Sequence, residues 1–312
     1  MPFQFAIKKV QNFDVIQLMD TELNVVVEIV SKGALLNSWQ WNQLENTYHF
    51  IEGNSIQSAL DFEKNGFRSA KMSPYVCRLH QGQYVHENTP YTMDHFYMGE
   101  HAIHGIMYDA NFTIQATEAN ENNATVVLSS HYLGTDKGYP FNFTMEIRWT
   151  LEKNNKLTVQ TSVTNNAATN IPIVDGWHPY FTIGESINDC TLQFLSKGKM
   201  EYDNNLLPTG NIIKDETFTK GFTIGQLQLD DGYELNETNP TCTLQNDKFI
   251  LTIYPSKGYP YLQLYTPPDR KSIAIENLSG APNAFNNKIG LQILKPQGKS
   301  IFETSYQVTI KQ

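Results

Sequence analysis

Apolar and polar positions alternate along most of the chain, the pattern of strands with one buried side and one side facing solvent. The alternating stretches, many rich in β-branched residues, are residues 23–41, 124–133, 141–165, 190–195, 242–256, 261–266, 272–277 and 299–310. Asn, Asp, Gly or Pro bound most of them, which supplies turn chemistry between the strands. The pattern predicts an all-β fold, a large antiparallel β-sandwich with few short helices.

Two local features refine this picture. The sequence EKNNKL at residues 152–157 predicts a hairpin, because Asn154 and Asn155 tolerate the positive φ that a tight turn requires. The stretch IQSALDFEKNGF at residues 56–67 is the best candidate for a short helix, and Gly66 could end it. No internal repeat or low-complexity linker marks a boundary, so we expect one domain over residues 1–312.

Composition narrows the range of partners. The chain has 312 residues, 40% of them hydrophobic, which is enough for a substantial core. Its net charge is −9, and its only arginines are Arg68, Arg78, Arg148 and Arg270. An acidic, arginine-poor chain argues against nucleic acid and against an anionic membrane surface, both of which attract clustered cations. A neutral ligand or a protein partner fits better.

Cysteine usage and hydropathy bear on the compartment. The three cysteines, Cys77, Cys190 and Cys242, are widely spaced and form neither a disulfide framework nor a CxxC metal motif. Scattered reduced thiols are typical of the cytoplasm. The first residues contain no apolar signal-peptide core, and no apolar run approaches the ~18 residues that a membrane helix needs. We therefore expect a cytoplasmic protein.

Three stretches depart from the alternating pattern and place polar groups among aromatic residues or glycines. They are MSPYVCRLHQGQY (72–84), HAIHGIMYDANF (101–112) and DGWHPYF (175–181). We expect DGWHPYF to form a loop that lines a cleft, because Gly and Pro are poorly suited to a core strand. In IAIENLSGAPNAF, Glu276 follows the apolar residues IAI and precedes a Gly-Pro-Asn segment, a suitable place for a carboxylate that lines a cleft.

These residues favour proton transfer over other chemistry. A histidine and a carboxylate in one cleft form a general acid–base pair whose pKa values burial and pairing can bring towards neutrality. His104 and His178 lack the spacing of a zinc motif, and no GxSxG elbow, GxGxxG or Walker sequence is present, so we predict neither a metal nor a cofactor. Alternatively, the histidines are structural and Trp177, Tyr180 and Phe181 are ordinary core residues rather than a surface for a sugar ring.

In chain order, SPYVCRLHQGQY, HAIHG, GWHPYF, LDDGYEL and IAIENLSGAPNAF resemble motifs of the aldose 1-epimerase (mutarotase) family, particularly its shorter bacterial members. The resemblance covers most of the chain. It implies the galactose mutarotase-like β-sandwich (supersandwich) fold, a small-molecule sugar as substrate, and isomerase activity without a cofactor.

The resemblance also implies roles for individual residues. By position, His178 would be the general acid at the ring oxygen, Glu276 the general base at the anomeric hydroxyl, and His104 a residue that positions the reacting end of the sugar. Arg78 and Asp230 would bind sugar hydroxyls, although a one-residue shift would place Asp231 there instead. Among the aromatic residues, Trp177 and Tyr180 would contact the substrate.

Two departures from the family pattern leave alternatives open. Cys77 stands where Asn is usual, and Asn277-Leu278 replaces a more usual pair after Glu276. The alternatives are a hexose-6-phosphate 1-epimerase, which would need a cationic phosphate site, and a non-catalytic sugar-binding or regulatory protein on the same fold. Neither the particular aldose nor the oligomeric state follows from the sequence.

Overall fold

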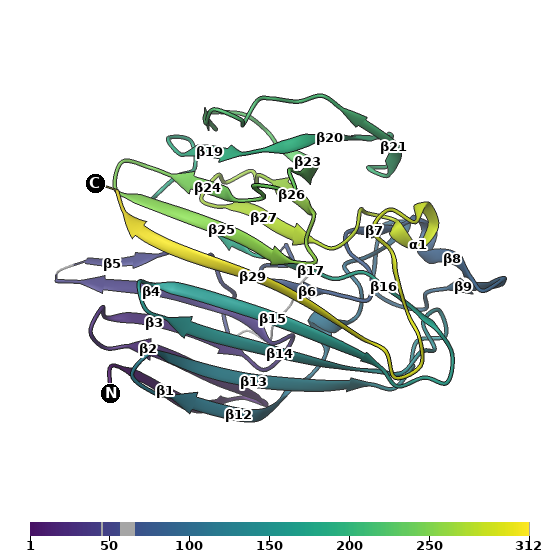
Figure 1. Ribbon diagram of the computed structural model, residues 1–312, viewed down its shortest axis with the longest axis horizontal. Coiled ribbons are helices and arrows are strands. Elements are labelled where there is room, and N and C mark those ends of the chain that lie inside the picture. Colours follow the sequence, from purple (N-terminus) through teal and green to yellow (C-terminus); the bar gives the residue numbers. More distant parts are fainter. Residues whose placement is uncertain (45, 57–65, 312) are drawn as a thin grey trace.

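The computed structural model describes residues 1–44, 46–56 and 66–311. The helix expected over residues 56–67 falls, apart from its ends, outside these described residues. Long antiparallel strands cross the molecule side by side (Figure 1). The expected all-β sandwich is therefore confirmed.

The largest sheet has nine strands. In spatial order they are β12 (Thr113–Ala119), β13 (Asn123–Tyr132), β14 (Phe143–Glu152), β15 (Lys156–Asn165), β29 (Lys299–Ile310), β25 (Phe249–Lys257), β24 (Cys242–Gln245), β19 (Thr191–Phe194) and β22 (Phe222–Thr223). Burial alternates residue by residue along β14, so one face of this sheet is in the core and the other faces solvent.

An eight-stranded sheet carries the strands that matter most below. They are β21 (Pro208–Ile213), β20 (Ser196–Tyr202), β23 (Asp230–Leu235), β26 (Tyr261–Tyr265), β27 (Ile273–Leu278), β17 (Gly176–His178) and β6 (Ala70–Met72) in spatial order, with β18 (Tyr180–Phe181) paired to β27. A five-stranded meander contains β1 (Phe3–Val10), β2 (Phe13–Asp20), β3 (Val25–Val30), β4 (Leu35–Gln43) and β5 (Asn46–His49).

Small elements complete the described chain. They are the three-stranded sheet β10 (Tyr97–Met98), β11 (His101–Ile103) and β7 (Arg78–Leu79); the pairs β8 (Gln83–His86) with β9 (Thr89–Thr92) and β16 (Ile171–Ile173) with β28 (Gln292–Leu294); the 3₁₀ turns η1 (His80–Gly82) and η2 (Met107–Asp109); and the single-turn helix α1 (Ala284–Asn287).

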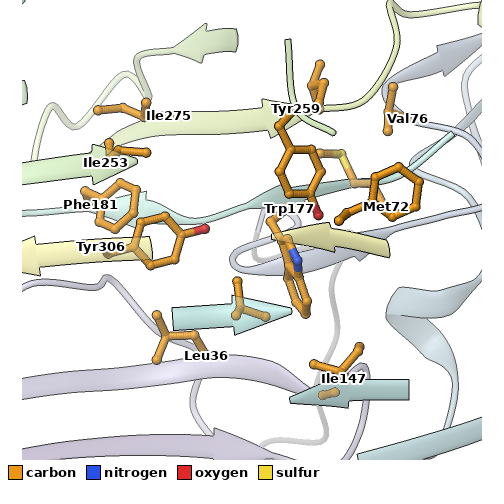
Figure 2. Close-up of a cluster of buried hydrophobic side chains, with 14 of the residues drawn as sticks. Leu36, Met72, Val76, Ile147, Trp177, Phe181, Ile253, Tyr259, Ile275 and Tyr306 are labelled. Carbon is orange, nitrogen blue, oxygen red and sulfur yellow. The ribbon is translucent and has the colours of Figure 1, made fainter. Parts of the chain in front are cut away.

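The core lies between the nine-stranded sheet and the other two large sheets. The Trp149 indole on β14 packs against Trp177 of the eight-stranded sheet, with ring centroids 5.3 Å apart, and its Nε1 donates to Ala34 O beside the meander at 2.9 Å. Phe181 packs against Tyr306 of β29 at 5.1 Å. Figure 2 shows Trp177, Phe181 and Tyr306 in this buried cluster. The eight-stranded sheet thus has one face against the core, and its other face is available for a site.

The hairpin expected at residues 152–157 is confirmed. Glu152 pairs with Lys156, so β14 and β15 are joined by the three residues Lys153, Asn154 and Asn155, of which Asn154 and Asn155 have positive φ values of 63° and 52°. The Asn155 side chain also serves the core, because Trp39 Nε1 on β4 donates to its Oδ1 at 2.8 Å.

The prediction of a loop at DGWHPYF is wrong. Gly176–His178 and Tyr180–Phe181 are short strands inside the eight-stranded sheet, separated by Pro179. Gly176 is required by close packing, because a Cβ there would lie 2.7 Å from Leu278 Cδ2. Glu276 lies near the end of β27, within the strand expected over residues 272–277. Both catalytic candidates are therefore held by paired strands, which is a more rigid support than a loop.

Candidate active site

A pocket of about 190 Å³ opens on the face of the eight-stranded sheet that points away from the nine-stranded sheet. Its walls are Gly66, Phe67, Cys77, Arg78, Met98, Ile103, His104, His178, Tyr180, Tyr202, Leu206, Asp230, Gln263, Tyr265, Glu276 and Pro282. These residues come from six strands of that sheet, from β7, β10 and β11, and from the connections between strands. All the candidate residues from the sequence except Trp177 are among them.

His178 and Glu276 lie side by side at the bottom of the pocket. His178 Nε2 is 3.3 Å from Glu276 Oε1, and the two residues are only 6% and 2% exposed. Strand geometry explains their direction. Asn277 accepts a hydrogen bond from Thr304 of β29 on the core side, and so Glu276, its neighbour on β27, points into the pocket. Residues 98 positions apart in the sequence thus bring an imidazole and a carboxyl group into contact.

Burial shifts the pKa values of this pair in opposite directions. Loss of solvent raises the pKa of Glu276 well above its ordinary value, and the nearby Asp230 carboxylate adds to the rise, whereas Arg78 opposes it. Loss of solvent lowers the pKa of His178 to about 3. These shifts favour a protonated carboxyl group in contact with a neutral imidazole over the ionic form of the pair.

His104 lies directly against His178. The two imidazoles meet edge to face with centroids 5.0 Å apart, and Phe67 packs against His104 at 4.6 Å. Its backbone has a φ of 59° and donates to Cys77 O at 2.9 Å, which connects this wall to the segment carrying Arg78. Burial lowers the pKa of His104 well below its ordinary value, so a neutral imidazole faces the pocket.

Arg78 and Cys77 form the neighbouring part of the wall. The Arg78 guanidinium lowers the pKa values of Glu276 and Asp230 against the effect of burial, so its positive charge acts on both carboxyl groups. Cys77 Sγ lies 3.9 Å from Glu276 Oε2. Burial raises the pKa of this thiol well above its ordinary value, so Cys77 presents a neutral thiol to the Glu276 carboxyl group.

The structure distinguishes the two adjacent aspartates of LDDGYEL. Asp230 lines the pocket, where its Oδ1 accepts from Gln263 Nε2 at 2.9 Å. Asp231 is not among the pocket residues and pairs instead with Lys199 at 2.6 Å. Successive residues of β23 point to opposite faces, which accounts for the separation.

Sequence reasoning missed the polar residues that complete this wall, Tyr202, Gln263 and Tyr265. Tyr202 donates its hydroxyl to Gln263 Oε1 at 2.8 Å, which orients the amide so that its nitrogen donates to Asp230. The hydroxyl occupies space that Gly232 leaves, because a Cβ at that glycine would lie 2.2 Å from it. In the sequence, the alternation in YLQLYT indicates only that Gln263 and Tyr265 lie on the same face of β26.

Tyr180 and Trp177 have different surroundings. The Tyr180 ring stacks in parallel on the His178 imidazole at 5.0 Å, and its hydroxyl donates to Gly66 O at 2.8 Å. Trp177 points to the other face of β17, into the core with Trp149 (Figure 2). The expected contact between Trp177 and a substrate does not agree with this position, because adjacent strand residues cannot both face the pocket.

Within residues 1–44, 46–56 and 66–311, no three or more His, Cys, Asp or Glu side chains are grouped so that they could hold a metal ion. No helix in the same ranges is long and apolar enough to cross a membrane.

Comparison with known proteins agrees with this fold. A galactose mutarotase-like protein from Clostridium acetobutylicum superposes with a TM-score of 0.86, covering 99% of both chains at 16% identity. The galactose 1-epimerase of Lactobacillus acidophilus NCFM gives a TM-score of 0.82, covering 99% of both chains at 20% identity. The uncharacterized Escherichia coli K12 protein YihR is 25% identical over 232 residues, which are 71% of this chain and 73% of that protein.

The fold defines a galactose mutarotase-like β-sandwich protein. The family model for aldose 1-epimerase matches residues 14–307, nearly the whole chain. The chain belongs to the aldose 1-epimerase family. This membership supports an epimerase of the isomerase class that acts on a sugar.

Proposed function

We propose that the protein is an aldose 1-epimerase that interconverts the α and β anomers of a free aldose by acid–base ring opening. The observation that carries the proposal is the contact of 3.3 Å between His178 Nε2 and Glu276 Oε1 at the bottom of a polar pocket. Asp230 and Gln263 offer acceptors and donors to sugar hydroxyls, and Arg78 offers a charged donor. The Tyr180 ring, stacked behind His178, limits solvent there.

The proposed reaction starts when the pair is in its ionic form, with a Glu276 carboxylate and a His178 imidazolium. Glu276 takes the proton of the C1 hydroxyl, and the C1–ring-oxygen bond breaks as C1 becomes an aldehyde. The electron pair of that bond goes to the ring oxygen, which receives the proton of His178. The pair then holds its proton on Glu276, the arrangement that burial favours. Rotation about C1–C2 and reclosure with reversed roles give the other anomer.

This scheme needs no net proton exchange with solvent. One proton stays within the pair throughout, and only its position changes between carboxyl and imidazole. In water the ionic form is favoured, whereas the opposite pKa shifts in the pocket favour the arrangement with the proton on Glu276. Neutral His104 can accept or donate a hydrogen bond at the reacting end of the sugar without adding charge.

Polarimetry tests the proposal directly. Freshly dissolved α-D-glucose, α-D-galactose, α-D-xylose and maltose should reach their equilibrium rotation faster with the protein than without it, for at least one sugar. Buffer alone and heat-denatured protein serve as controls. If calorimetry detects binding of one of these sugars but rotation is unaffected, the protein is a sugar-binding protein and the proposed activity is wrong.

The same assay addresses the phosphorylated substrate. Among the described pocket residues, Arg78 is the one lysine or arginine, and the nearby Arg68 pairs with Glu52 at 2.7 Å. A phosphate ester usually requires more cationic donors than this. We therefore expect kcat/KM for glucose 6-phosphate to be at least ~10-fold below that for glucose, since an unpaired dianion costs more than one charged hydrogen bond returns.

Substitution of the two aspartates tests the substrate-binding wall. Asp230→Asn should raise KM about tenfold with a smaller effect on kcat, because an amide replaces a charged acceptor for a sugar hydroxyl. Asp231→Asn is the matched control and should leave both constants unchanged, because that carboxylate pairs with Lys199 outside the pocket. Equal effects of the two substitutions on KM would contradict the assignment. Steady-state polarimetry supplies both constants.

We also propose that the protein works in the cytoplasm. The three cysteines, Cys77, Cys190 and Cys242, are all buried free thiols. Proteins of oxidising compartments usually pair their cysteines in disulfides, whereas free thiols are the rule where glutathione and thioredoxin keep them reduced.

A further inference from the structure

A buried ion pair lies directly behind the acid–base pair, on the core side of the same sheet. Lys71 on β6 and Asp175, just before β17, are both 0% exposed, and Lys71 Nζ lies 2.5 Å from Asp175 Oδ1. The Lys71 ammonium is also 4.4 Å from the centre of the Trp177 ring. Charges are seldom fully buried, because their desolvation is costly even when they are paired. The mechanism proposed above makes no direct use of either residue.

The pair is the centre of a directional hydrogen-bond network. Asp175 Oδ1 accepts from the Tyr259 hydroxyl at 2.7 Å as well as from Lys71. Lys71 Nζ makes a second bond, to Gly176 O, at 3.2 Å. Tyr259 packs against Phe302 of β29, with ring centroids 5.7 Å apart. The network therefore connects β6 and the start of β17 to the opposite sheet.

The same network fixes the strands that carry the acid and the base. On β6 and β17, Ala70 is the register partner of His178, and Lys71 is the partner of Trp177. Asp175 is bound at its backbone to Ser279, which follows β27: Asp175 N donates to Ser279 Oγ, and Ser279 N donates to Asp175 O, both at 2.8 Å. A displacement of Asp175 would thus move β17 relative to β27, and with it His178 relative to Glu276.

We propose that Lys71 and Asp175 are positioning residues that hold His178 at its working distance from Glu276. The expected effect on kcat rests on the proposed function, whereas the effect on the position of His178 does not. Apolar residues of similar volume would stabilise the fold as well as an ion pair does, or better, so stability alone does not account for the pair. Lys71 donates a directional hydrogen bond to Gly176 O, and Asp175 accepts one from Tyr259. These bonds fix the register of β17, the strand that carries His178, which apolar contacts cannot do. An acid–base pair that must transfer a proton is sensitive to such displacements.

A double substitution separates positioning from stability. Lys71→Met alone leaves the Asp175 charge buried without its partner and should lower Tm strongly. Lys71→Met combined with Asp175→Leu removes both charges and should recover most of that Tm. If the pair positions His178, kcat of the double variant stays at least ~10-fold below wild type, while KM stays within about twofold. Recovery of kcat together with Tm would overturn the proposal.

Single substitutions that leave the ion pair in place test the same proposal if the double variant folds poorly. Tyr259→Phe removes one bond to Asp175 but leaves the ion pair, and it should lower kcat about threefold. Tyr306→Phe, a buried hydroxyl deletion in the same interface, is its control and should leave kcat unchanged. Asn155→Ala removes the buried bond from Trp39 and should lower Tm without lowering kcat. Equal kcat values for Tyr259→Phe and Tyr306→Phe would also overturn the proposal.

An NMR measurement distinguishes failure of this inference from failure of the proposed function. If wild-type protein accelerates the mutarotation of none of the sugars, the proposed function fails, and kinetics no longer report on positioning. The imidazole signals of His178 still do. They should shift in the double variant and in Tyr259→Phe, and remain unchanged in Tyr306→Phe and Asn155→Ala. Unshifted signals in the double variant would show that Lys71 and Asp175 do not position His178.

Discussion

Glu276→Gln is expected to lower kcat for mutarotation at least ~100-fold, the typical contribution of a positioned general base. The amide keeps the size of the side chain and can still bind the anomeric hydroxyl, but it cannot take its proton. KM should therefore change much less than kcat. Polarimetry with the best substrate from the sugar panel gives both constants. Near wild-type kcat in this variant would contradict the role of Glu276.

The same substitution should not destabilise the folded protein at neutral pH. Burial holds the pKa of Glu276 above its value in the unfolded chain. Between these two pKa values the folded state binds more protons than the unfolded state, so the free energy of unfolding falls as pH rises. Glutamine removes this cost, so Glu276→Gln should gain stability relative to wild type as pH rises through that interval. Thermal unfolding at several pH values measures the difference.

A carboxylate elsewhere on the eight-stranded sheet supplies the control. Glu234 on β23 pairs with Lys197 at the surface, at 2.8 Å, and is not among the pocket residues. Glu234→Gln should change neither kcat nor the dependence of stability on pH appreciably, because exposed ion pairs contribute little. A fall in kcat comparable to that of Glu276→Gln would mean that the loss reflects a general change of charge.

The long strands and the hairpin between β14 and β15 could be predicted from the sequence, because the alternation of apolar and polar residues within each strand shows which side is buried. In β14, for example, inward and outward residues alternate without interruption. The short strands at Gly176–Phe181 could not, because they are buried on both faces and contain Gly and Pro. Their extended form depends on pairing with β6 and β27, strands far away in the sequence. Tertiary context here overrides local preference.

For the candidate site, the sequence predicts which residues take part better than it predicts how they are arranged in space. The motifs identified His178 and Glu276, but nothing local indicated that Gln263 lies directly opposite Glu276 in the sheet. The alternating pattern shows that neighbouring residues of a strand point to opposite faces of the sheet. It does not show which face lines the pocket. For that reason the sequence leaves the choice between Asp230 and Asp231 open. The expectation that Trp177 contacts the substrate rests on a loop at residues 175–181, where the structure has strands. Strand register supplies this information, and it follows from pairing between distant segments.

His178→Asn is expected to lower kcat at least ~100-fold by removing the acid at the ring oxygen. Its pH dependence is more informative than the size of the loss. In wild type the working pair holds one proton, so activity should fall when a second proton is added and when the only proton is lost. Burial lowers the pKa of His178 and raises that of Glu276, which places the acid limb of kcat/KM below the ordinary range of histidine.

In the His178→Asn variant this bell shape should disappear. Only Glu276 remains, and residual activity requires its carboxylate, so kcat/KM should rise with pH through the raised pKa of Glu276 and not fall again. Polarimetric rates over a wide pH range, compared with the uncatalysed rate at each pH, measure both profiles. An alkaline limb that persists in the variant would mean that the second proton-transfer group is not His178. His104, 5.0 Å away, would then be the next residue to replace.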